Sequence, residues 1–304
     1  MMRLLISLSV FLLFPLGVFA SDAPRVVVSI KPIHSLASHV MAGVASPELL
    51  LNGSQSPHNF ALRPSDVRKI ARADLIVWVG AGLEMPLAKT LKTAKSTTGI
   101  VELLKDPKID LLETREEAHW DEQSHGDHRH HSHTLDPHIW LSPLNAERVV
   151  QLLVSELSRV DPVNREKYYA NGVKTVLKLK QLDRDIKRQI QGVRHVPYLV
   201  FHDAYQHFER RYGLNAVGSV TVSPDRSPGA RHVMALRNKI KGQTVRCIFS
   251  EPQFKPKLVQ MLIKDSKVKS GVLDPLGVDL PAGKDNYFKL MRNLAASLNQ
   301  CLSN

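Results

Sequence analysis

The stretch Leu75-Ile-Val-Trp-Val-Gly80 decides how the chain folds, because it is a near-continuous apolar run that ends in glycine. Such a run predicts a strand that is covered on both faces, as strands of parallel sheets are. A helical pattern begins before it at Arg63-Pro-Ser-Asp66, and another follows it over 83–94. A buried strand between two helices is the repeating unit of an α/β domain with a parallel sheet.

The same alternation of strand and helix patterns continues on both sides of this run. Strands are predicted over 25–30, 48–51, 75–80 and 100–104, and again over 197–202, 217–222, 245–250 and 271–273. Further helices are predicted over 33–43, 142–160, 204–212, 228–241, 255–264 and 286–302. The 304 residues suffice for two domains with a sizeable core. We therefore predict an α/β fold with two parallel-sheet lobes.

One predicted helix is long enough to connect the two lobes. It begins at Asp161-Pro162, an N-cap residue followed by proline at the first helical position. Apolar residues then recur every three or four positions, at Tyr169, Val173, Val176, Leu179, Leu182, Ile186 and Ile190. Such a helix spans roughly 40 Å. We predict a rigid connecting helix over 161–191, between an N-terminal lobe of 21–160 and a C-terminal lobe of 192–304.

Residues 1–20 are typical of a secretory signal peptide. Arg3 provides a positive n-region, the run from Leu4 to Val18 is mostly apolar, and Ala20 is a small residue suited to signal peptidase. The apolar run is too short to span a bilayer as a helix. We expect cleavage after Ala20 and, because no cysteine lies near that site, no lipid anchor. The mature chain is then expected in free solution in a periplasm-like compartment.

The exported part contains two cysteines, Cys247 and Cys301. In an oxidising compartment a single pair is most simply one disulfide, which would close a loop of about 55 residues. Two buried free thiols are the alternative. The formal charge of +12 does not indicate nucleic-acid binding, since the basic residues are scattered among acids without interleaved aromatic residues. A basic surface of this kind favours anionic lipid headgroups or an acidic partner.

The stretch His119–Trp140, HWDEQSHGDHRHHSHTLDPHIW, is dense in histidine and acidic residues. Neutral imidazole is the commonest protein ligand for zinc, copper and nickel, so the stretch predicts metal handling. We place it in a His-rich loop over 115–137. The six histidines that form an expected accessory metal tract are His119, His125, His128, His130, His131 and His133.

Single histidines also stand where predicted strands or loops end. His58 follows the second strand, His138 follows the His-rich loop, and His202 ends the fifth strand. In open α/β sheets, ligands bind beyond the carboxyl ends of strands. Three imidazoles with a carboxylate such as Asp274, or with water, make a four-coordinate zinc shell. Spacing alone does not prove that these residues converge, and for each histidine a surface or core role is the alternative.

Several stretches together resemble one known family. They are PHNFALRPSD (57–66), ADLIVWVGAGLE (73–84), DPHIWLSP (136–143), VFHDAYQHFERRYGL (200–214), FSEPQF (249–254) and LDPLG (273–277). They resemble the zinc-specific substrate-binding proteins of bacterial ABC metal importers, in the wider family that also contains manganese binders and metal-binding lipoprotein adhesins. The resemblance covers nearly all of 25–302 and implies two lobes joined by one long helix, with the metal in the cleft between them.

The resemblance implies that His58, His138 and His202 are the metal ligands. At the third position the manganese branch tends to have glutamate, and imidazole suits zinc better. The family's carboxylate position matches Asp274, whereas some zinc binders have a glutamate where this chain has Pro57. The fourth ligand is therefore open between Asp274 and water.

Two further residues near these motifs have expected roles. We expect Glu251 either to hydrogen-bond to a metal ligand without binding the metal itself, or to have a purely structural role. His207 is expected on the surface.

The function that the resemblance implies is capture of Zn²⁺ as transported cargo and its delivery to an ABC importer, with no enzymatic activity. The expected partners are a membrane permease with its ATPase and, as a further candidate, an accessory periplasmic zinc chaperone. Nucleic acid is not expected as a partner, and the chain is expected to be a monomer. The alternatives are a zinc hydrolase or hydratase with a three-histidine site, and a periplasmic zinc buffer or adhesin.

Overall fold

The computed structural model describes residues 23–53, 55–115, 134–221, 228–242, 245–254 and 257–303. The predicted signal peptide and the six histidines of the accessory tract lie outside the described residues. The strands are β1 (Val26–Ile30), β2 (Glu48–Leu51), β3 (Leu75–Trp78), β4 (Gly99–Glu102), β5 (Tyr198–His202), β6 (Ala216–Thr221), β7 (Cys247–Ser250) and β8 (Lys269–Val272). Each predicted strand is present, with its ends shifted by at most two residues.

The strands form two parallel sheets, so the predicted fold class is confirmed. The first sheet has the order β2-β1-β3-β4 and the second has the order β6-β5-β7-β8. The two lobes thus repeat one topology. In each lobe the chain starts at an inner strand, moves to one edge, and then crosses back to the other side.

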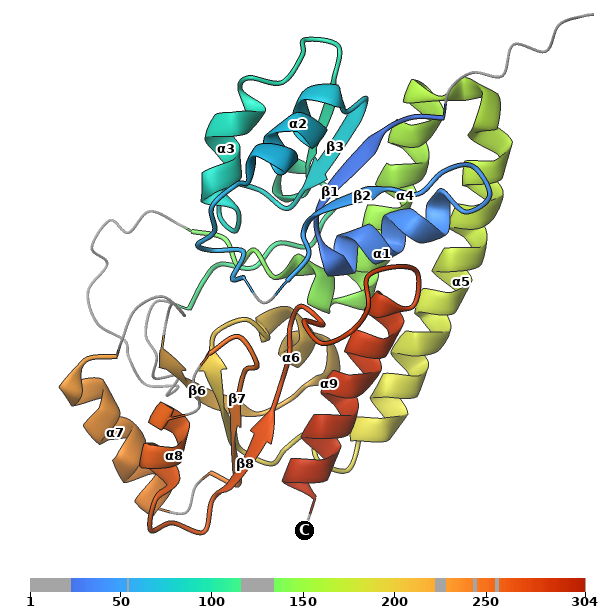
Figure 1. The fold of residues 1–304 in the computed structure, drawn as a ribbon. Coiled ribbons are helices and arrows are strands. Elements are labelled where there is room, and N and C mark those ends of the chain that lie inside the picture. The colour runs from blue at the N-terminus through green and yellow to red at the C-terminus, as the bar shows by residue number, and fades with distance from the viewer. Residues whose placement is uncertain are drawn as a thin grey trace, which may run out of the picture.

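The helices cover both faces of each sheet (Figure 1). They are α1 (Lys31–Val40), α2 (Pro64–Arg72), α3 (Met85–Leu91), α4 (Pro143–Val160), α5 (Arg165–Ile190), α6 (Gln206–Tyr212), α7 (Ala230–Lys241), α8 (Lys257–Ile263) and α9 (Asn286–Leu302). The described residues also form short 3-10 helices: η1 (Leu103–Lys105), η2 (Ile139–Leu141) and η3 (Pro162–Asn164). Within the described ranges, no helix is both long and apolar enough to cross a bilayer.

Alternate residues of the inner strands enter different cores, which is why their sequences are continuously apolar. In β1, Val26 and Val28 join the large core under α1, α4, α5 and α9, while Val27 joins a smaller core under α2 and α3. In β5, Val200 joins the large core and Leu199 joins a core under α7 and α8. Because the large core contains residues of both lobes, the lobes share one packed helical layer.

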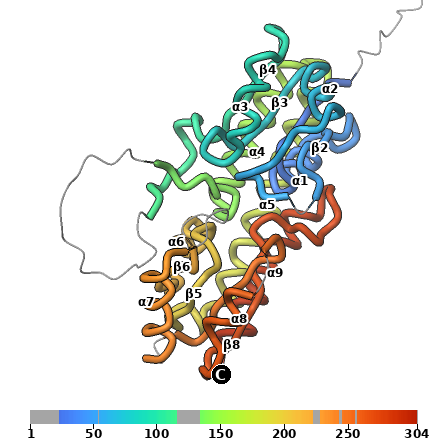
Figure 2. Tube along the Cα trace, turned by 60° about the vertical axis from the view of Figure 1, so that its left-hand side comes forward, coloured from blue at the N-terminus to red at the C-terminus, as the bar shows by residue number. Residues whose placement is uncertain are grey.

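Helix α5 runs along both lobes in this shared layer, and Figure 2 shows the lobes one above the other beside it. It begins after η3 instead of directly at Pro162. The expected apolar positions Leu179, Leu182, Ile186 and Ile190 are buried, but Tyr169 and Val173 are exposed. In this half of the helix, Tyr168 and Gly172 face the core instead. A Cβ at Gly172 would lie 2.5 Å from Val154 Cγ2, so glycine lets α4 and α5 approach closely.

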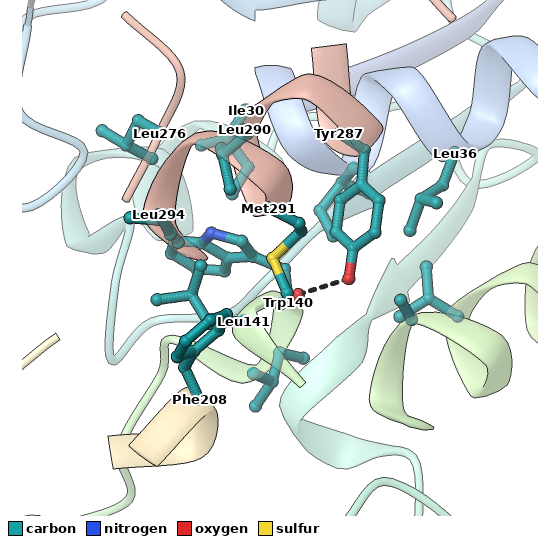
Figure 3. Packing of buried hydrophobic residues seen from close by; sticks show 14 of the residues in the cluster. Ile30, Leu36, Trp140, Leu141, Phe208, Leu276, Tyr287, Leu290, Met291 and Leu294 are labelled. Atoms are coloured by element: carbon teal, nitrogen blue, oxygen red, sulfur yellow. Dashed lines mark hydrogen bonds between the residues drawn. The ribbon is translucent and has the colours of Figure 1, made fainter. Parts of the chain in front are cut away.

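Trp140, the middle residue of η2, joins the lobes. Its ring lies among Leu276, Tyr287 and Leu294 (Figure 3). The indole Nε1 donates to the carbonyl oxygen of Pro275 at 2.7 Å, and the hydroxyl of Tyr287 donates to the carbonyl oxygen of Trp140 at 2.8 Å. Both buried polar groups are therefore satisfied across the lobe boundary.

Lys31 makes a second connection between the lobes. Its Nζ donates to the carbonyl oxygens of Val278 at 2.6 Å and Leu280 at 3.0 Å, and it also contacts that of Gly277. Burial lowers the pKa of Lys31, although Asp274 and Asp279 oppose this shift. A cation that binds several carbonyls fixes the 277–280 turn against the start of α1.

The predicted disulfide is present. Cys247 in β7 is bonded to Cys301 in α9, with 54 residues of sequence separation, so the terminal helix is tied to the second sheet.

Replacing both cysteines, Cys247→Ser with Cys301→Ser, should lower the free energy of unfolding by roughly 4 kcal/mol, because the open chain gains loop entropy. Guanidinium denaturation of the variant and of the oxidised wild type measures this difference. Zinc affinity serves as the control and should be unchanged. An unaltered denaturation midpoint would contradict the prediction.

Candidate metal centre

Three histidines from three different segments converge between the lobes. His58 lies in the loop after β2, His138 directly precedes η2, and His202 is the last residue of β5. One ligand nitrogen from each lies within 4.8 Å of the other two. Among the described residues, these three histidines form the group of side chains close enough together to hold one metal ion.

The spacing of the nitrogens fits a single zinc ion. Nε2 of His138 and Nε2 of His202 are 3.5 Å apart. Two nitrogens bound to one zinc ion in a tetrahedral shell lie about 3.4 Å apart, given ordinary Zn–N bonds. The ring centroids are 5.3 to 5.8 Å apart, so the rings surround a common point.

Sheet topology explains why His202 lies here. In the order β6-β5-β7-β8 the chain changes direction between β5 and β7, and ligands bind at such switch points beyond the carboxyl ends of the strands. His202 ends β5 and Glu251 directly follows β7. The neighbouring strand ends therefore bring an imidazole and a carboxylate together.

Two buried carboxylates orient two of the histidines. Asp136 Oδ1 accepts from Nδ1 of His138 at 2.7 Å and from its backbone N–H at 3.0 Å. Glu251 Oε1 lies 2.5 Å from Nδ1 of His202. A hydrogen bond at Nδ1 fixes the tautomer and leaves Nε2 for the metal. Glu251 thus has the supporting position expected from sequence, whereas the role of Asp136 was not predicted, although it stands two residues before His138.

The third histidine has a different environment. Nε2 of His58 is buried and has no hydrogen-bond partner. Buried polar atoms are normally satisfied, so an unpaired imidazole nitrogen beside two others fits a metal ligand. A cavity of about 10 Å³ adjoins the three rings, which is room for about one ion or water molecule.

The environment keeps two of the three imidazoles neutral. Burial, with the neighbouring histidines, lowers the pKa of His58 to about 2 and lowers the pKa of His138 well below its ordinary value. Burial also acts to lower the pKa of His202, but the charge and hydrogen bond of Glu251 outweigh it and raise that pKa. If the three histidines hold a metal, His202 is therefore the one at which a proton would compete with it.

Asp274 lies outside this group of ligands. Its Oδ1 accepts from the backbone N–H groups of Leu276 and Gly277, each at 3.0 Å, and its Oδ2 accepts from that of Val278 at 2.6 Å. Oδ1 also accepts from the side chain of Gln253. The carboxylate is thus used to hold the turn that Lys31 binds.

The expectation that His207 lies on the surface is wrong. His207 is buried in α6, and its Nε2 donates to the carbonyl oxygen of Asp136 at 3.3 Å. It packs behind the Asp136–His138 pair because α6 begins only four residues after His202 and turns back over η2.

The chain is similar in sequence and in fold to known zinc-uptake proteins. A family model described as ZnuA, zinc-uptake complex component A, periplasmic, matches residues 26–301. The high-affinity zinc uptake system protein ZnuA of Brucella suis biovar 1 is 38% identical in an alignment that covers 93% of each chain. The protein of the same description from Yersinia pestis is 34% identical in an alignment that again covers 93% of each chain. A crystal structure of ZnuA superposes with a TM-score of 0.79 at 25% identity, covering 93% of this chain and all of the other.

His202→Ala should weaken zinc binding more than a hundredfold, because it removes a direct ligand, whereas His207→Ala should weaken it about tenfold through Asp136. Competition with a chelator of known affinity measures both. His195→Ala, at an exposed histidine, is the control and should have no effect. Equal losses for His202→Ala and His207→Ala would mean that His202 is not a ligand.

Zinc affinity should fall about tenfold for each pH unit below the raised pKa of His202, since one proton must leave that ring. His58 and His138 are already neutral and add no further dependence. Chelator competition at a series of pH values gives the slope. Glu251→Gln should move the fall to lower pH, because the carboxylate no longer raises the pKa of His202. A three-proton slope, or none, would contradict this assignment.

Proposed function

The chain belongs to the ZnuA family of periplasmic components of zinc-uptake complexes, and from this membership and the three-histidine centre we propose that it captures zinc outside the cytoplasm and delivers it to the membrane permease of an ABC importer. The family consists of substrate-binding components and not of enzymes. The observation that carries the proposal is the convergence of one nitrogen from each of His58, His138 and His202 within 4.8 Å.

Zinc is supported as cargo by the chemistry of the donors. Imidazole nitrogen suits zinc, whereas manganese prefers carboxylate and other oxygen ligands. We assign His58, His138 and His202 as the three protein ligands and a water molecule as the fourth. The hydrogen bonds that occupy both oxygens of Asp274 support water over that carboxylate.

The six histidines of the accessory tract complete the proposal. We assign them a collecting role, in which individually weak sites gather zinc and pass it by ligand exchange to the tight centre. Export follows the predicted signal peptide, with cleavage after Ala20 and no lipid anchor, and the mature chain acts as a monomer. Its partners are the permease with its ATPase and, further along the route, an accessory periplasmic zinc chaperone.

The function is tested by growth of a bacterium that lacks its own zinc-binding component. The wild-type chain should restore growth in zinc-chelated medium, and His138→Ala should not, because two imidazoles hold zinc far less tightly than three. The variant must be present at wild-type level for the comparison. If the chain restored growth by supplying manganese instead of zinc, the proposed cargo would be wrong.

Deleting residues 119–133 should lower the number of zinc ions bound at saturation and leave the tightest site intact. Calorimetric titration separates the two effects, since the tight site gives the first step of the isotherm. If the deletion variant lost the first step of the isotherm, the tract would have to supply a ligand of the tight site.

A further inference from the structure

An open cavity of about 610 Å³ is lined by the three histidines. Its wall includes His58, His138 and His202 together with the carboxylate residue Asp203. Asp203 is not among the side chains whose ligand atoms lie within 4.8 Å of one another, but it lines the same cavity as all three of them. Its position therefore decides whether a metal bound there has three protein ligands or four.

Asp203 faces this cavity because the chain bends directly after β5. The backbone N–H of Ala204 donates to the carbonyl oxygen of His202 at 2.9 Å, which closes a tight turn centred on Asp203. Simple alternation along a continuing strand would have turned Asp203 away from His202. Instead, both side chains line one cavity, and that of Asp203 is only 10% exposed.

A guanidinium from the other lobe holds this carboxylate. Arg115 lies in the segment after η1, and its Nε donates to Asp203 Oδ2 at 2.8 Å while its terminal nitrogen binds Oδ1. The same terminal nitrogen donates to Glu209 Oε2 at 2.9 Å. Such a two-point pair fixes the orientation of the carboxylate as well as its charge.

The other acids close to the ligands are held in different ways. Asp136 and Glu251 bind Nδ1 of ligand histidines and so act from behind the rings. Glu102, on the cavity wall, pairs with Lys105 of its own segment at 2.8 Å. Asp203 differs because it is next to a ligand in sequence, shares the cavity with all three, and is held by a cation from across the cleft.

We propose that Arg115 is a positioning residue of the metal centre, which keeps the carboxylate of Asp203 off the metal and so leaves the three-histidine centre with an open fourth position. The inference rests on the proposed function. A carboxylate oxygen is an ordinary zinc ligand, and a buried one without its cation would be drawn to a nearby dication. Keeping the carboxylate of Asp203 off the metal leaves the fourth position open, so the bound ion can exchange its ligands, as a delivery protein requires.

The test uses the whole mature chain loaded with Co²⁺, whose visible spectrum reports its ligands. Azide is added as a probe of the open position. Wild type should bind azide with a change in the spectrum. Arg115→Met should not, because Asp203 then occupies that position, and Arg115→Met with Asp203→Asn should bind azide again. Arg115→Lys, which keeps the charge, should resemble wild type.

Zinc affinity gives an independent readout of the same variants. Arg115→Met should bind zinc about tenfold more tightly than wild type, and the double variant should lose this gain. If Arg115→Met still binds azide, or if both variants lose zinc faster than wild type, Arg115 merely ties the lobes together and the inference is wrong. If wild type itself takes up neither Co²⁺ nor Zn²⁺, the proposed function fails instead.

Discussion

In the proposed zinc centre, three neutral imidazoles would leave the dication its full charge, and the rest of the structure depends on how that charge is balanced. The balance comes from carboxylates near the three histidines: the buried Asp136 and Glu251 bind Nδ1 of two rings, and the largely buried Asp203 and the buried Glu209 bind Arg115. Arg115 offsets part of this negative charge before any metal arrives. Without such an arrangement, burying the ion would carry a large desolvation cost. The ligands can therefore be few and neutral, which favours exchange, while the protein as a whole remains electrostatically suited to a cation.

The two lobes must hold these groups at fixed distances, and their contacts explain how. Trp140 and Tyr287 connect the lobes through buried hydrogen bonds, and Lys31 binds the 277–280 turn of the opposite lobe. Arg115 also bridges the lobes, through its ion pairs with Asp203 and Glu209. With α5 packed along both lobes in a shared core, a large hinge motion would break all of these contacts together. A cleft of this construction favours small local movements over wide opening, and an ion then leaves by exchange of ligands at an open coordination position.

The parts of the fold that were predictable from sequence are those in which one local pattern has one structural solution. The continuous apolar runs at 75–80 and 197–202 need two covered faces, and a pair of cysteines in an exported chain has a single partner choice. The register of α5 was harder, because Tyr168 and Tyr169 are the same residue type. The buried face is the one on which Tyr168 donates to Asp161 and Gly172 admits Val154. The histidines could be proposed from strand ends and motifs. His207 was misplaced because its burial depends on how α6 folds back, and the Arg115 pair could not be seen because its partners lie 88 and 94 residues away.

Asp274 and Asp203 show why residue type alone does not define a metal site. Both are carboxylates near the cleft, and both follow strand ends that point toward it. Asp274 is satisfied by backbone N–H groups of its own turn, so drawing it to a metal would leave those donors unpaired and loosen the turn that Lys31 holds. Asp203 is satisfied by one side chain from the other lobe, so a single change in that partner would release it. Competing hydrogen-bond donors thus decide which carboxylates can bind the metal. In a centre that must release its ion, donors that occupy the nearby carboxylates make that release easier.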